Sequence, residues 1–234
     1  MSPPSPAFTA ILFGLSGCLV DFGARTVALT LQHLCPNTKH PRGLEQALGH
    51  TPTPNELEHY QRVLCEFARD QAELTPSTAQ LLDSLHQQNI PCAWLDELPS
   101  DACQHLASAL PTWLTGTTLQ HQRPWPAPDA IWESLMALKA ERLNGCVLVS
   151  GEPRLLQAGL NAGIWTIGLA ISGPLCGMAI ADWQSQTTRE RDQLRSQATL
   201  SLYRLGVHSV IDQLSDLPTC LQDISLRQQK GERP

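Results

Sequence analysis

The sequence contains no apolar run that approaches the ~20 residues needed to cross a bilayer. Residues 1–7 are rich in proline and lack the basic and apolar regions of a secretory signal. The eight cysteines include no Cys-x-x-Cys pair, so their spacing offers no zinc site and favours reduced cytosolic thiols. Only 16 Lys and Arg residues are present, scattered along a chain of net charge −6, which argues against a nucleic-acid binder. These absences predict a cytoplasmic protein without a membrane or nucleic-acid partner.

What the sequence does contain is an alternation of apolar runs and amphipathic segments. An apolar run at residues 8–13 is followed directly by glycine and serine, as is typical of a buried parallel strand. From residue 75 onward the same pattern predicts strands that alternate with helices; the strands are at 90–95, from 113, 146–149, 165–171 and 209–211. This βα alternation predicts a doubly wound parallel sheet in an α/β protein.

The segment between the first strand and residue 75 interrupts the alternation, because it has helical periodicity but no strand pattern. An inserted helical cap domain at 23–74 explains the interruption. The core domain is then expected at 8–22 and 75–225, and the terminal residues 1–7 and 226–234 are expected to be disordered tails.

Several segments carry a family resemblance. The first is Phe-Gly-Leu-Ser-Gly-Cys-Leu-Val-Asp at 13–21; the others are Gln-Arg-Pro-Trp at 122–125, Asn-Gly-Cys-Val-Leu-Val-Ser-Gly at 144–151 and Asn-Ala-Gly-Ile-Trp-Thr-Ile-Gly at 161–168. In order and spacing they resemble the haloacid dehalogenase superfamily, and most of all its phosphonoacetaldehyde hydrolases (phosphonatases). The resemblance implies a Rossmann-like core with an inserted cap, an aspartate nucleophile, magnesium, and a cap lysine that forms a Schiff base.

The chain departs from this family at the positions that carry its chemistry. Gly14 stands where the family has its nucleophilic aspartate, and Gln46 stands where phosphonatases have the Schiff-base lysine. Ser16 is a small residue that phosphonatases also tolerate, whereas Gly151 and Leu155 replace two acids associated with magnesium. We therefore expect no catalytic residues, no metal site and no cofactor.

A second set of residues is expected to bind a ligand: Arg123, Asp96, Ser16, Ser150 and Glu152. Arg123 matches the family's phosphate-binding cation, and Asp96 follows the neighbouring strand, so we predict an Asp96–Arg123 ion pair that fills the former phosphate site. An alternative alignment, shifted by one residue, lets Glu152 stand for a metal-binding aspartate.

The function expected from these departures is that of a non-catalytic binding or regulatory protein with a protein partner. Trp94, Trp125 and Leu98 would suit such a contact if they gathered at the cleft. A homodimer through the cap is implied only by the resemblance. Two alternatives stay open: a hydrolase or phosphatase that uses substitute groups such as Asp96, Glu97 or Glu152, and a sensor of phosphorylated or phosphonate metabolites that relies on Arg123.

Overall fold

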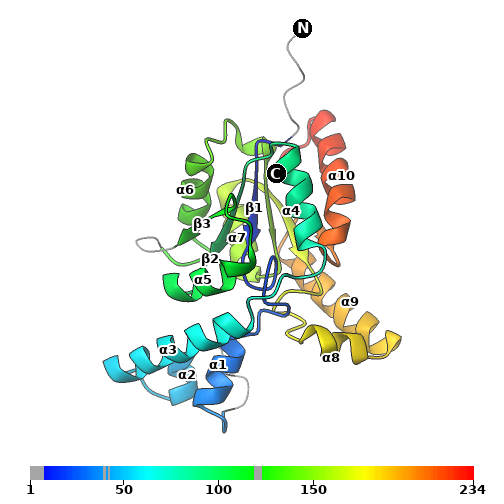
Figure 1. Ribbon diagram of the computed structural model, residues 1–234. Helices are drawn as coiled ribbons and strands as arrows, with labels where there is room; N and C mark the ends of the chain where they lie inside the picture. Colours follow the sequence, from blue (N-terminus) through cyan, green and yellow to red (C-terminus); the bar gives the residue numbers. More distant parts are fainter. Residues whose placement is uncertain (1–7, 39–40, 42, 119–122) are drawn as a thin grey trace.

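A computed structural model describes residues 8–38, 41, 43–118 and 123–234 (Figure 1). Its centre is one six-stranded parallel sheet with the strand order β3-β2-β1-β4-β5-β6. The strands are β1 (Ala10–Gly14), β2 (Cys92–Asp96), β3 (Thr115–Thr118), β4 (Cys146–Ser150), β5 (Trp165–Leu169) and β6 (Ser209–Ile211). This arrangement confirms the doubly wound parallel α/β fold.

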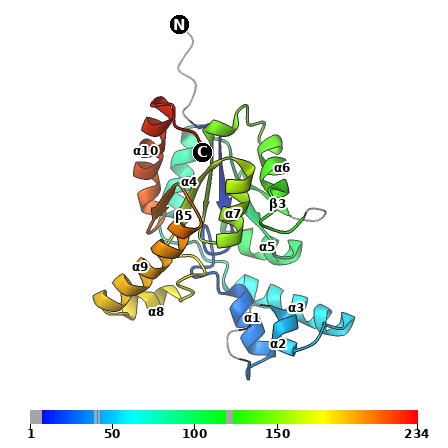
Figure 2. The ribbon, with the colours of Figure 1, turned by 180° about the vertical axis from the view of Figure 1, so that it is seen from behind.

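Helices cover both faces of the sheet, as the two opposite views show (Figures 1 and 2). One face carries α4 (Thr78–Gln87), α5 (Ser100–Leu106) and α10 (Leu217–Gln229); the other carries α6 (Asp129–Ala137), α7 (Pro153–Ala162) and α9 (Thr188–Arg204). In β1, Ile11 and Phe13 point to the first face, and Ala10 and Leu12 point to the second. Because both faces are covered, β1 is apolar at every position.

Three helices lie between β1 and α4, in the segment predicted to form a cap: α1 (Thr26–Leu34), α2 (Leu44–Leu48) and α3 (Pro54–Asp70). They extend away from the carboxyl edge of the sheet (Figure 2), and α3 packs against both α1 and α5. A capping box starts α3, because Thr53 and Glu56 satisfy each other's backbone N–H groups. The assignment of this unit as a separate cap domain stays a prediction.

Two sequence predictions differ from the structure. The prediction that residues 226–234 form a disordered tail is wrong for the first part of that segment. There α10 continues to Gln229, and Arg227 donates a hydrogen bond to the His208 carbonyl at 3.1 Å. The other predicted tail, residues 1–7, lies outside the described residues. The polar sequence from 184 to 205 has an amphipathic pattern that predicts one helical stretch, but the structure divides it between α8 (Ile180–Ser185) and α9. The division occurs because Thr187 forms a capping box with Glu190, and this box begins a new helix. None of the described helices is long and apolar enough to span a bilayer.

Candidate functional site

A cleft of about 850 Å³ opens at the carboxyl ends of β1, β2 and β4. In doubly wound α/β folds, ligands bind at this edge of the sheet. Residues that follow each strand form the floor and sides, and Val27 and Ala28 of α1 close the cleft from the helical unit. The candidate residues Gly14, Ser16, Asp96, Ser150, Glu152 and Leu155 all line it.

The floor of the cleft is closely packed at Gly14. A Cβ atom built there would lie 2.7 Å from the Ser150 Oγ, 3.3 Å from the Ser150 Cβ and 3.5 Å from a methyl group of Leu155. Ser150 is fully buried, and its hydroxyl accepts a hydrogen bond from the Glu152 N–H at 3.0 Å. No side chain fits at position 14 unless Ser150 moves, so the position lacks both a carboxylate and the room for one.

Ser16 uses its polar groups within the protein. Its N–H donates to the Asp96 Oδ2 at 3.0 Å, and its hydroxyl donates to the Asp21 Oδ2 at 2.7 Å. The buried Asp21 carboxylate also accepts from the Arg25 N–H and from both the N–H and the hydroxyl of Thr26. The site residues predicted from the sequence did not include Asp21. Its position at the end of the first motif could have indicated that it lies beside Ser16.

Asp96 is buried at the end of β2. Burial raises the pKa of its carboxyl to about 6, although hydrogen bonds from the N–H groups of Ser16 and Leu98 lower it. The negative charges of Asp21 and Glu152 add to the increase in pKa. The two backbone donors hold one carboxylate oxygen each, so Asp96 is fixed in place.

The predicted Asp96–Arg123 ion pair is wrong. Arg123 forms an ion pair with Asp129 instead, and the distance between the Arg123 Nη2 and the Asp129 Oδ2 is 3.0 Å. The Arg123 side chain is 71% exposed and does not line the cleft. The physical reason is proximity along the chain, because Asp129 begins α6 only a short loop after Arg123.

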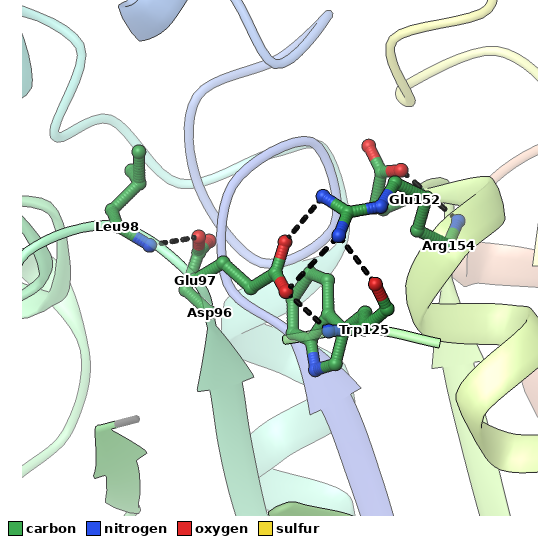
Figure 3. A network of polar contacts seen from close by, with 6 residues as sticks. All are labelled: Asp96, Glu97, Leu98, Trp125, Glu152 and Arg154. Carbon is green, nitrogen blue, oxygen red and sulfur yellow. Dashed lines mark hydrogen bonds and ion pairs between the residues drawn. The ribbon is translucent and has the colours of Figure 1, made fainter. Parts of the chain in front are cut away.

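The arginine among the described residues that line the cleft is Arg154, in the first turn of α7 (Figure 3). Its Nη1 donates to the Glu97 Oε2 at 2.6 Å, and its Nη2 donates to the Trp125 carbonyl. The same Glu97 carboxylate accepts a hydrogen bond from the Trp125 N–H. No role was predicted for Arg154 from the sequence. Its position shortly after the end of a predicted strand could have indicated that it lies in the cleft, because ligands bind at the carboxyl ends of the strands in this fold.

Glu152 begins α7 and lies beside this network (Figure 3). Its Oε1 accepts from the Arg154 N–H at 3.0 Å, which satisfies an otherwise unpaired helix N–H. Burial raises the pKa of the Glu152 carboxyl above its ordinary value, although the Arg154 N–H and guanidinium oppose that increase.

The residues present do not fit the magnesium site that the family would imply. Magnesium prefers hard oxygen ligands in octahedral geometry. Gly14, Gly151 and Leu155 supply no side-chain oxygen, and a Cβ at Gly151 would lie 2.4 Å from the Gly173 Cα. Across the described ranges, no group of three or more His, Cys, Asp or Glu side chains could hold a metal ion.

Other predicted residues lie away from the cleft. Gln46 is in α2 and does not line the cleft, while Trp94 is buried on the opposite face of the sheet from Trp125. The suggested cluster of Trp94, Trp125 and Leu98 therefore does not form. Cys18 lies in the first motif, and its thiol could be considered as a replacement for the missing nucleophile. It is fully buried, however, and burial raises the pKa of its thiol far above the ordinary value, so it does not supply a reactive thiolate.

No family model matches the chain. Phosphonoacetaldehyde hydrolase from Klebsiella pneumoniae is 36% identical over 109 residues, a match that spans 47% of this chain and 40% of that protein. Phosphonoacetaldehyde hydrolase from Bordetella pertussis aligns at 25% identity over 96% of this chain and 95% of its own length. The chain belongs to the haloacid dehalogenase superfamily. Within that superfamily it lies on the phosphonatase-like branch.

Solved structures agree with this haloacid dehalogenase fold. A crystal structure 46% identical in sequence covers 97% of this chain and 100% of its own, with a TM-score of 0.77. A phosphonoacetaldehyde hydrolase-like protein from Oleispira antarctica superposes with a TM-score of 0.84 at 21% identity, over 98% of this chain and 96% of its own. At that identity the second likeness supports the fold alone.

Proposed function

We propose that this phosphonatase-like protein has lost hydrolase activity and acts as a non-catalytic binding or regulatory protein. The observation that carries the proposal is the packing at Gly14. Phosphoryl transfer in this family begins with attack by a carboxylate at that position, and here the space belongs to the Ser150 side chain. Loss of one member of a catalytic set can lower the rate on the order of 10⁴ to 10⁶-fold.

The charge of the cleft supports the same proposal. Catalysis of phosphoryl transfer requires neutralisation of the charge on the transferring group. Among the described residues that line the cleft, three carry carboxyl groups, Asp96, Glu97 and Glu152, and the one arginine, Arg154, is already paired with Glu97. A phosphate or phosphonate dianion would therefore meet net repulsion.

The hydrolase alternative has less support. Asp96 is buried, and both of its oxygens accept backbone hydrogen bonds, so it is not free to attack a substrate. Glu97 is held by Arg154, and Glu152 accepts from the helix N–H of Arg154. The phosphate sensor that relies on Arg123 also loses support, because Arg123 is paired with Asp129 away from the cleft.

The test is phosphate release from phosphonoacetaldehyde and a panel of phosphomonoesters, with and without magnesium. We expect no release above the background without protein, from the natural chain or from Arg154→Ala. Turnover that requires magnesium and is lost in Arg154→Ala would contradict the proposal and establish the hydrolase alternative. Glu97→Ala, which unpairs the cation, is expected to remain equally inactive.

The partner we propose is another protein, and a homodimer through residues 23–74 is a further proposal. Apolar side chains of Val27, Leu98 and Leu175 line the cleft near the helical unit, and Leu57 of α3 is exposed. Sedimentation velocity of the natural chain and of Leu57→Asp tests the homodimer. A dimer that dissociates in the variant supports it, and a monomer at all concentrations contradicts it.

A further inference from the structure

The contacts of Glu97 resemble those of a bound ligand more than those of an ordinary surface ion pair. Its carboxylate is held by the forked guanidinium of Arg154 on one side and by a backbone N–H, that of Trp125, on the other (Figure 3). A guanidinium fork combined with a backbone N–H is a favourable arrangement for binding a carboxylate group.

We propose that Arg154 and the Trp125 N–H form a subsite for the carboxylate of a ligand, and that Glu97 occupies this subsite until the ligand displaces it. The inference rests on the proposed function in one respect, which is that the ligand is bound and not converted. Glu97 then acts as an internal competitor that keeps the cation paired when no ligand is present.

The subsite is accessible from the cleft. The Arg154 side chain is 54% exposed and that of Glu97 is 21% exposed, and both line the 850 Å³ cleft. Glu97 lies in the loop between β2 and α5, so its side chain can move toward water without disturbing either element. A ligand carboxylate would replace the Glu97 carboxylate with the same two donors, so few interactions are lost in the exchange.

The surrounding charge favours a monoanion over a dianion. Asp96 and Glu152 also line the cleft, so two further carboxyl groups lie on the same surface as Arg154. A phosphate dianion at Arg154 would be repelled by these groups about twice as strongly as a carboxylate, because the Coulomb energy is proportional to the charge. The ligand class is therefore a carboxylic acid, whose remaining part contacts apolar side chains such as Leu98 and Leu175.

The chain offers a matched control for the cation. Arg123 is a second arginine in a side-chain ion pair, with Asp129, but it does not line the cleft. Arg123→Met and Arg154→Met remove the same charge with the same change of size. Only Arg154→Met should affect binding at the subsite.

The experiment is an NMR titration of the 234-residue chain with acetate at pH 7.5, followed at the Trp125 backbone amide. If Glu97 leaves the subsite about a tenth of the time, Glu97→Ala should bind acetate about tenfold more tightly than the natural chain. Glu97→Ala/Arg154→Met should lose that gain, and Glu97→Ala/Arg123→Met should keep it. Glu97→Gln, which preserves the size of the side chain and removes its charge, should also bind more tightly and replaces Glu97→Ala if that variant does not fold.

Acetate binding that is no tighter in both Glu97 variants, or that persists without Arg154, would overturn the subsite. Inorganic phosphate that binds Glu97→Ala more tightly than acetate would overturn the assignment to a monocarboxylate. These results are separable from failure of the proposed function, because phosphate release by the natural chain would contradict the loss of catalysis and leave acetate binding unchanged.

Discussion

The contact between Gly14 and Ser150 gives a quantitative prediction about why no side chain stands at the head of the first motif. At an unobstructed site with ordinary backbone angles, Gly→Ala stabilises a protein by about 0.4–1 kcal/mol, because it restricts the unfolded chain. At Gly14 the new methyl group would lie 2.7 Å from the Ser150 Oγ and 3.3 Å from its Cβ. Overpacking of this kind costs about 1–3 kcal/mol, so Gly14→Ala should be destabilising by about 1–2 kcal/mol.

Removing the obstruction should reverse the sign of that effect. Ser150→Gly alone should cost about 1–2 kcal/mol, because the Glu152 N–H loses its acceptor and a strand end gains a glycine. In a Ser150→Gly background, Gly14→Ala should become stabilising, which gives a coupling free energy of about 2 kcal/mol between the two positions. Ser150→Ala should relieve only part of the strain, because its Cβ remains 3.3 Å away.

The measurement is urea unfolding of the four proteins of this cycle at 25 °C, monitored by far-UV circular dichroism. The m-values should agree, so that the free energies of unfolding can be compared directly. Additive effects, with a coupling below about 0.5 kcal/mol, would refute the claim that Ser150 occupies the space of the missing side chain.

The other predictions concern burial and capping. The folded-state pKa of Asp96, about 6, lies above its ordinary value of 3.8, so its contribution to stability is full below pH 3.8 and is lost as the pH rises through 6. When the pH is lowered from 7 to 4.5, the free energy of unfolding of the natural chain should therefore increase by about 2 kcal/mol relative to that of Asp96→Asn. A difference between the two proteins that stays constant with pH in urea unfolding would contradict this. Cys18 should resist alkylation by iodoacetamide in the folded protein and react after denaturation, as peptide mass spectrometry would reveal; rapid labelling of the folded chain would show that its burial is not maintained. Thr187→Ala should lower the free energy of unfolding by about 1 kcal/mol through loss of the α9 capping box, whereas an unchanged value would mean that α9 does not depend on this cap.

Local patterns in the sequence were sufficient to predict the sheet. Apolar runs such as residues 8–13 and 146–149 are buried on both faces, so their composition alone indicates strands. The boundary between α8 and α9 was missed, because the polar stretch around residue 186 has helical composition on both sides. The capping box at Thr187 was present as Thr-x-x-Glu and would have marked the boundary.

The site was predictable in location but not in its pairings. Strand ends converge in a doubly wound sheet, so Gly14, Asp96 and Ser150 were correctly brought to one edge. Which cation meets which carboxylate depends on side-chain reach and on loop paths that no spacing rule contains. Arg123 was therefore assigned to Asp96, whereas the cleft contains a pair formed by Arg154 and Glu97.

The central place of β1 in the sheet has a consequence for biosynthesis. Its hydrogen-bonding partners on the two sides, β2 and β4, follow far later in the chain, and Ala10 is paired with Cys146. At a translation rate of about 5–20 residues per second, the ribosome needs roughly 7 to 30 s to complete the second of these partners. Throughout that interval β1, a strand that is buried at every position in the folded protein, has an unpaired edge. Nascent chains that stop before β4 should therefore depend on chaperones, and aggregation during synthesis should decrease sharply once residue 150 has left the exit tunnel.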